Sequence, residues 1–158
     1  MIMNLLDFLK EQNLKLQSVS KNEIEQLFAL VERDLEDARF QGISLDRKFI
    51  TAYNAGLQLA TIVLRAEGYR TNPQKSGHHK ICIQVLPLIM GRKVSDFADF
   101  LNACRLKRHA CEYTCANEVN EKEVERLLGK IEGFHALVIE WLKKCHPQLL
   151  PYLKNSRK

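Results

Sequence analysis

Residues 95–118 read SDFADFLNACRLKRHACEYTCANE. At about 3.6 residues per turn, this stretch predicts a helix with one mainly apolar stripe, formed by Phe97, Leu101, Cys104, Arg108, Cys111 and Cys115. Arg108 is the exception on that stripe, because its guanidinium stays charged and is costly to bury without acceptors. We predict that the acceptor is either a protein carboxylate, such as Glu112, or a bound phosphate. The two alternatives imply different functions.

Length and composition favour a single helical domain. The chain has 158 residues, of which 46% are hydrophobic, which is enough for one domain with a full core. Only 7 Gly and 4 Pro occur and no segment sustains a period of two, which argues against an all-β protein. No apolar run approaches the roughly 20 residues that span a bilayer, and Met1–Leu6 is too short for a signal peptide core. We therefore expect a soluble, cytoplasmic protein.

Apolar periodicity and capping residues predict where the helices lie. The predicted helices cover 4–12, 20–42, 77–91, 95–115 and 121–145, and Pro87 should kink the helix over 77–91. One further helix is predicted to begin at residue 44 and to end within the segment 65–70. Ser20 and Glu23 have capping-box spacing, and Ser44 and Asn120 also begin helices. The segment 69–77 is the longest polar connection, and we expect it to be a mobile loop.

These elements predict an all-α, up-and-down bundle of four long helices plus a short N-terminal helix. It forms one domain over 1–158, with its core at about 20–145 and a basic tail at 146–158. Ala52, Gly56 and Ala60 are spaced by four, so that another helix can approach this seam closely.

Charge and cysteine content restrict the ligand class only weakly. The net charge of +5 permits an anionic partner without requiring one. The densest basic clusters are 105–109 and 154–158. We expect the five cysteines to stay reduced and to bind no metal, because no CxxC occurs and three thiols on one rigid helix cannot converge on one ion.

Three residues outside residues 95–118 are candidates for anion contacts. His78 and His79 open a predicted helix, where they could meet an anion or make only local hydrogen bonds. Arg65 is either a contact of the same kind or an ordinary cation at a helix C-terminus.

The motif Arg108-His109-Ala110-Cys111-Glu112-Tyr113 resembles the R-x(4–6)-H signature found on a late helix of the HEPN superfamily. Tyr113 stands at the position of the motif histidine, and the pairing of Arg105 with His109 is one residue too short. The chain is most similar to the subgroup with R-N-x-x-E-Y, with His109 in place of the asparagine. A looser resemblance extends over 20–144, in the order of helices and the paired histidines after the long loop.

The resemblance implies a helical, cofactor-free protein directed at RNA. Many HEPN proteins are metal-independent endoribonucleases and toxins, paired with a nucleotidyltransferase-like antitoxin, and they work as homodimers whose motif arginines meet in a cleft. Arg108, Tyr113 and His109 would then be the catalytic residues, with substrate contacts from Arg105, Glu112, His78, His79 and Arg65.

The replacement of the motif histidine leaves the activity open. An unperturbed tyrosine titrates near pH 10, so Tyr113 is a poor base at neutrality, although it can donate a hydrogen bond to phosphate. His109 points about 100° away from Arg108 on a helix, and His78 or His79 could enter instead from the neighbouring helix. Two hypotheses follow: an HEPN-like RNA-directed protein, active or degenerate, and a non-catalytic helical interaction module in which Arg108 forms a structural ion pair.

Overall fold

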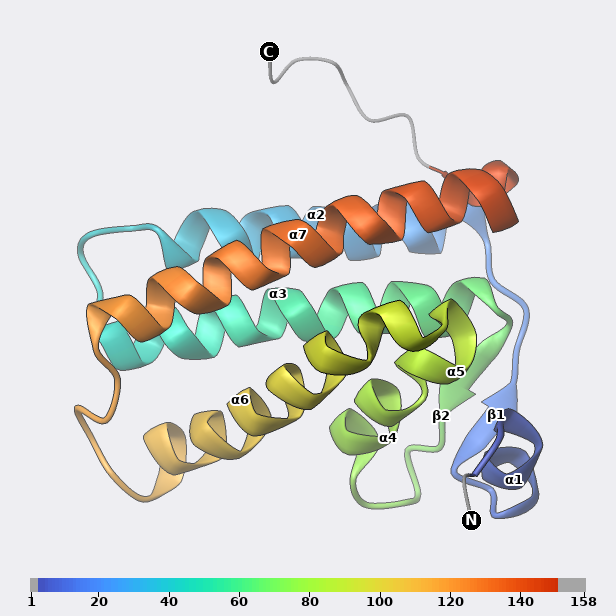
Figure 1. Ribbon diagram of the computed structural model, residues 1–158, viewed down its shortest axis with the longest axis horizontal. Coiled ribbons are helices and arrows are strands. Elements are labelled where there is room, and N and C mark those ends of the chain that lie inside the picture. The colour runs from blue at the N-terminus through green and yellow to red at the C-terminus, as the bar shows by residue number, and fades with distance from the viewer. Residues whose placement is uncertain (1–2, 151–158) are drawn as a thin grey trace.

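The computed structural model describes residues 3–150 and confirms an all-α helical bundle (Figure 1). The part of the predicted basic tail that covers 151–158 lies outside these residues. The four long helices are α2 (Lys21–Ala38), α3 (Leu45–Ala66), α6 (Ser95–Tyr113) and α7 (Glu121–Cys145). Shorter elements are α1 (Leu5–Lys10), β1 (Leu14–Leu16), β2 (Tyr69–Thr71), α4 (His78–Gln84), α5 (Leu86–Met90) and the 3₁₀ turns η1 (Arg92–Val94) and η2 (Pro147–Leu149).

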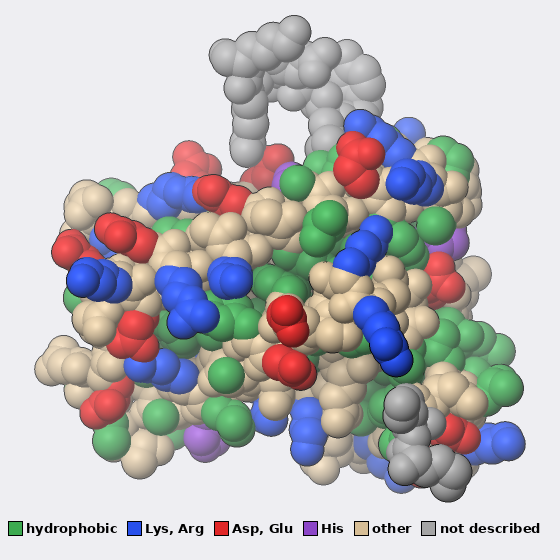
Figure 2. Space-filling view, viewed as in Figure 1, with side chains coloured by type: hydrophobic (Ala, Val, Ile, Leu, Met, Phe, Trp, Pro, Cys, Tyr) green, Lys and Arg blue, Asp and Glu red, His purple; other side chains and the backbone are tan. Residues whose placement is uncertain are grey.

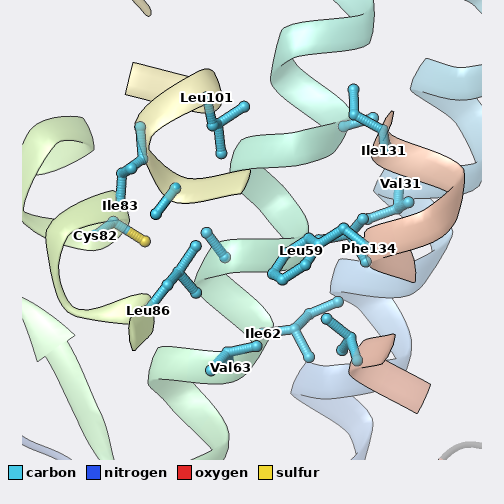
Figure 3. Close-up of a cluster of buried hydrophobic side chains, with 14 of the residues drawn as sticks. Val31, Leu59, Ile62, Val63, Cys82, Ile83, Leu86, Leu101, Ile131 and Phe134 are labelled. Carbon is cyan, nitrogen blue, oxygen red and sulfur yellow. The ribbon is translucent and has the colours of Figure 1, made fainter. Parts of the chain in front are cut away.

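Helix α3 lies at the centre of the bundle and is covered on several sides. After its first turn, α3 carries few charged residues, and its apolar residues lie on more than one face of the helix. More than one face is therefore buried. Helices α2, α4, α6 and α7 all contact it. Figure 3 shows the resulting core, in which side chains from these helices and α5 surround those of α3: Val31, Leu59, Ile62, Val63, Cys82, Ile83, Leu86, Leu101, Ile131 and Phe134.

The predicted small-residue seam is confirmed at Gly56. Ala52 and Ala60 are fully buried, and a Cβ added at Gly56 would lie 3.0 Å from Leu101 Cδ1 and 3.4 Å from Ile131 Cγ1. The missing side chain therefore lets α6 and α7 approach α3 together.

Three predicted N-caps are confirmed, but one capping box is only half formed. The side chains of Ser20, Ser44 and Asn120 each accept a hydrogen bond from the backbone three residues on. Asn120 forms the complete box with Glu123. At α2, however, the Glu23 carboxylate turns to the Arg65 guanidinium, because a charge-assisted pair is stronger than a bond to a neutral backbone N–H.

The expectation of one mobile loop over 69–77 is wrong for its first part. Residues Tyr69–Thr71 form β2, which pairs antiparallel with β1, with Leu14 opposite Thr71. Three-residue strands are too short to show a period of two in the sequence, so no alternation could predict them. This small sheet ties the N-terminal segment to the connection after α3.

The single predicted helix over 77–91 is divided at Val85. Helix α4 ends at Gln84 and α5 begins at Leu86, with Pro87 in its first turn. Proline has no N–H to donate and its ring clashes with the preceding turn, which accounts for the break at the predicted kink. The break turns the chain so that α4 contacts α6.

Helix α6 is buried at its start and exposed at its end. Leu101 and Cys104 are buried, whereas Arg108 and Cys111 are only partly covered and Cys115 is exposed. In Figure 1, α6 crosses obliquely below α3 and its C-terminal half diverges from it at lower left. The stripe predicted to be core is therefore core only in its first half, which places Arg108 at the edge of the bundle.

We predict that Gly56→Leu lowers the free energy of unfolding by about 1–3 kcal/mol, because the added side chain overpacks the contact among α3, α6 and α7. Gly129→Ala is the matched control: no atom lies within 4 Å of its added Cβ, so it should raise stability by up to about 1 kcal/mol through helix propensity. Urea denaturation measures both. A stabilised Gly56→Leu protein would contradict the close packing of this seam.

Candidate functional site

A cleft of about 420 Å³ lies between the start of α4 and the C-terminal half of α6. We call it the α4–α6 cleft. Basic side chains dominate its lining, which consists of Gly77, His78, His79, Lys80, Arg105, Leu106, Arg108 and His109. Within residues 3–150, no Asp or Glu lines it. Figure 2 shows Lys, Arg and His side chains at the lower edge of the molecule, on the surface formed by α6 and α4.

Arg108 is held at the wall of this cleft by one carboxylate and one aromatic ring. Its Nη2 lies 3.1 Å from Glu112 Oε2, one helical turn away, and both side chains keep about a quarter of their exposure, at 22% and 25%. Its Cζ lies 5.8 Å from the centroid of the Tyr53 ring, within the range of a cation–π contact. Arg108 Nε is buried and finds no hydrogen-bond partner in the described part of the chain. The guanidinium is therefore positioned but not fully satisfied.

Tyr53 of α3 lies between Arg108 and His79. Its side chain is fully buried, and its hydroxyl has no hydrogen-bond partner within residues 3–150. Burial raises the pKa of this hydroxyl well above its ordinary value, although the nearby Arg108 charge opposes the rise. Tyr53 thus stays a neutral phenol. The ring of His79 lies 6.2 Å from that of Tyr53.

The fold changes the protonation of His79, one of the side chains that line the cleft. Its burial lowers its pKa below the ordinary 6.5, and the positive charges of Arg108, His78 and Arg105 lower the pKa further. His79 therefore carries a neutral imidazole at neutral pH, the form that can accept a proton.

The basic cluster at 105–109 is divided between two sides of α6. Arg105 faces the cleft, where its Nε donates a 3.0 Å hydrogen bond to Asn102 Oδ1. Lys107 instead pairs with Glu123 of α7, and this hydrogen bond lowers the pKa of the Glu123 carboxyl. Helical geometry explains the division, since residues two apart lie on different faces.

His109 lines the cleft, whereas Tyr113 does not. The rings of His109 and Tyr113 are 5.0 Å apart, but the Tyr113 side chain is 68% exposed and lies on the outer surface of α6. Of the residues predicted for catalysis, the structure thus places Arg108 and His109 in one cleft and Tyr113 beside it.

Arg65 is occupied by the protein itself. It is 7% exposed and donates to the Glu23 carboxylate at 2.8 Å and to the carbonyls of Gln17, Ser18 and Tyr69 at 2.8–3.1 Å. This network joins α3 to the segments before α2 and after α3. Since these acceptors already take its donors, the guanidinium acts first as a structural clamp.

The described residues offer no metal site. Within residues 3–150, no group of three His, Cys, Asp or Glu side chains is arranged to hold a metal ion, and the five cysteines are free thiols. Burial raises the pKa of Cys82 to about 12 and that of Cys104 to about 11, so both thiols stay protonated. In the same part of the chain, no helix combines the length and apolar character needed to cross a membrane.

Sequence reasoning missed Tyr53 and Lys80 as parts of the site. Tyr53 sits on the apolar face of its helix, and nothing in that pattern separates a buried tyrosine beneath a cleft from an ordinary core residue. Lys80 directly follows His78 and His79, which the sequence analysis named as candidate anion contacts, so its place in the cleft could have been inferred from theirs.

No protein-family model, curated protein or solved structure matches this chain.

We predict that Arg65→Ala lowers the free energy of unfolding by about 3 kcal/mol, because it leaves buried carbonyls and the Glu23 carboxylate without their donor. The matched control is Arg39→Ala, which removes an exposed pair with Glu132 and should cost less than about 1 kcal/mol. Urea denaturation compares the two variants. Equal losses would show that Arg65 is not a structural clamp.

We predict that the wild-type protein loses stability relative to His79→Gln as the pH falls below about 6.5. The folded protein lowers the pKa of His79, so the unfolded chain binds more protons at these pH values. The stability from neutral His79 is fully present above the unfolded pKa and is lost as the pH falls through the folded pKa. Urea unfolding at a series of pH values measures the difference. A difference that does not vary with pH would contradict the burial of His79.

Proposed function

We propose that the α4–α6 cleft binds the phosphates of RNA and that this protein is an HEPN-like, RNA-directed protein. The observation that supports this most directly is the meeting of His78, His79 and Lys80 with Arg105, Arg108 and His109, in a lining without carboxylates among residues 3–150. Such a lining attracts an anion.

The geometry of Arg108 favours phosphate in particular. Glu112 occupies one edge of its guanidinium through Nη2, while Arg108 still lines the cleft and its side chain keeps 22% of its exposure. Arginine donates in a planar fork that matches phosphate oxygens, and Arg105 adds a second fork in the same cleft. RNA offers a succession of phosphates to such a site.

The same cleft contains groups suited to cutting RNA without metal. We propose that neutral His79 accepts the proton of a ribose 2′-hydroxyl, whose oxygen then bonds to the adjacent phosphorus. The bond from phosphorus to the 5′-oxygen breaks, and that oxygen leaves with a proton donated by His109, the histidine side chain of α6 that lines the cleft. Arg108 and Arg105 stabilise the charge on the phosphate oxygens. The products are a 2′,3′-cyclic phosphate and a 5′-hydroxyl.

We also propose a homodimer and a nucleotidyltransferase-like antitoxin as partners, in a toxin–antitoxin pair. Both follow from the resemblance of the motif over 108–113 to HEPN proteins. Two exposed apolar side chains of α6 add support for the dimer, because a second copy would cover them: Leu106, which lines the cleft and is 59% exposed, and Tyr113, which lies beside it and is 68% exposed.

The second candidate function is a non-catalytic helical interaction module, in which Arg108 serves only as a structural partner of Glu112. The 3.1 Å contact between these two side chains favours it. The partial exposure of the pair argues that its contribution to stability is small, as for other i,i+4 pairs near a surface.

We predict that the wild-type protein binds single-stranded RNA and that Arg108→Ala weakens binding about tenfold or more, through the loss of a charge-assisted phosphate contact. The slope of log affinity against log salt should fall by about 0.7 per lost contact. Fluorescence anisotropy measures binding.

Gel analysis of RNA in EDTA across about pH 6 to 9 measures cutting. Cutting should need the 2′-hydroxyl and should be lost in His79→Gln.

Arg126→Ala is the control, since Arg126 is an exposed arginine outside this cleft. Arg108→Ala should lower the free energy of unfolding by about 1 kcal/mol at most, from a partly exposed pair and one cation–π contact. A loss of about 3–5 kcal/mol, with RNA affinity unchanged, would favour the structural module instead. Binding without cutting would identify a degenerate relative, and absence of binding would end the proposal.

A further inference from the structure

A second hollow adjoins the α4–α6 cleft. It has a volume of about 320 Å³ and lies between α3, β2 and the start of α4. His78 and His79 line both this hollow and the cleft, so the two share a wall. We call it the α3–β2 hollow. Its size falls within the range of small-ligand sites.

Arg70 is the cation of this hollow that the protein leaves without an acceptor. It is half-buried on β2, and in the described part of the chain no side chain or carbonyl takes a hydrogen bond or ion pair from its guanidinium. Arg65 lines the same hollow but is bound to Glu23 and three carbonyls. Of the two arginines in this hollow, Arg65 is therefore satisfied by the protein, whereas the Arg70 guanidinium is available to a ligand.

The backbone and the polar lining support a defined ligand position. Arg70 pairs with Lys15 across the β1–β2 ladder, which fixes its Cα. Gln58 and Thr71 add neutral hydrogen-bonding groups to the lining. Thr61 Oγ1 donates to the carbonyl of Leu57 and lies 3.7 Å from Cys82 Sγ, whose thiol donates to it, so one lone pair of Thr61 is left to accept from a ligand. As in the cleft, the lining contains no Asp or Glu among the described residues.

We propose that the α3–β2 hollow is a second nucleotide subsite, in which Arg70 binds the phosphate next to the one held at Arg105 and Arg108. Gln58 and Thr71 hydrogen-bond the nucleotide between these two phosphates, and the strand passes over His78 and His79. This inference rests on the proposed function, because it extends the same RNA strand. The ligand of the two subsites is a single-stranded RNA of at least two nucleotides. A base that is paired in a duplex would have to leave the duplex before it could enter the α4–α6 cleft or the α3–β2 hollow.

The experiment compares the affinities of unlabelled uridine monophosphate and of uridine oligonucleotides of two, four and eight residues, by competition against a labelled RNA. All of these RNAs carry 2′-O-methyl groups, which remove the nucleophile of the proposed cutting reaction, so they stay intact during the measurement. Arg70→Ala should weaken binding of the tetranucleotide about tenfold and lower its salt slope by about 0.7, while leaving the monophosphate affinity unchanged. Gln58→Ala, a neutral change on a helix, should also weaken only the oligonucleotides. Arg92→Ala, an exposed arginine outside both hollows, is the control and should change neither.

The outcomes separate this inference from the proposed function. If Arg105→Ala weakens the tetranucleotide while Arg70→Ala and Gln58→Ala do not, the second subsite is overturned and the cleft remains an RNA site. If Arg70→Ala weakens the monophosphate as much as the tetranucleotide, Arg70 belongs to the first subsite and the inference is also overturned. If the wild-type protein binds none of these RNAs, both proposals fail together.

Discussion

The burial of α3 on several faces is the constraint on which the rest of the structure depends. A helix with apolar residues around most of its circumference must be covered by several others, because each exposed apolar side would cost hydration free energy. Helices α2 and α7 cover it along much of its length, and α4 and the start of α6 cover the rest. The second half of α6 then diverges, and the cleft lies where this cover ends.

Two arginines illustrate how the same side chain acquires different roles in this bundle. Arg65 is nearly inaccessible and finds a carboxylate and three carbonyls, so its charge is compensated within the chain. Arg108 is more exposed, shares one carboxylate, and rests on the ring of Tyr53 with Nε unmatched in the described residues. Satisfaction of donors, rather than burial alone, separates the structural arginine from the candidate ligand contact.

The features that could be predicted from the sequence are those encoded by neighbouring residues. The caps at Ser20, Ser44 and Asn120 depend on spacings of three or four, so they were correctly predicted, whereas the predicted stripe on α6 is core only in its first half. The pairing of Arg108 with Glu112 was likewise visible as an i,i+4 spacing. The helix break at Val85 was anticipated only as a kink at the nearby proline.

Features that depend on distant contacts were beyond the sequence. Arg65 and Glu23 are 42 residues apart, and the competition that diverts Glu23 from its capping box exists only in the folded chain. The two three-residue strands, β1 and β2, likewise exist as strands only because they pair with each other. For the site, the paired histidines and the arginines of α6 were each recognised, but their meeting in one cleft required the turn between α4 and α5.

The distribution of the five thiols has a practical consequence. Cys82 and Cys104 are buried and strongly protonated, whereas Cys115 and Cys145 are exposed. Cys115 lies in the connection between α6 and α7, two residues after the end of α6, and Cys145 is the final residue of α7, a helix of 25 residues that is about 37 Å long. The unmodified chain therefore carries two exposed attachment points for spectroscopic reporters, one in the α6–α7 connection and one at the C-terminal residue of α7, so their separation would report on the length of the bundle.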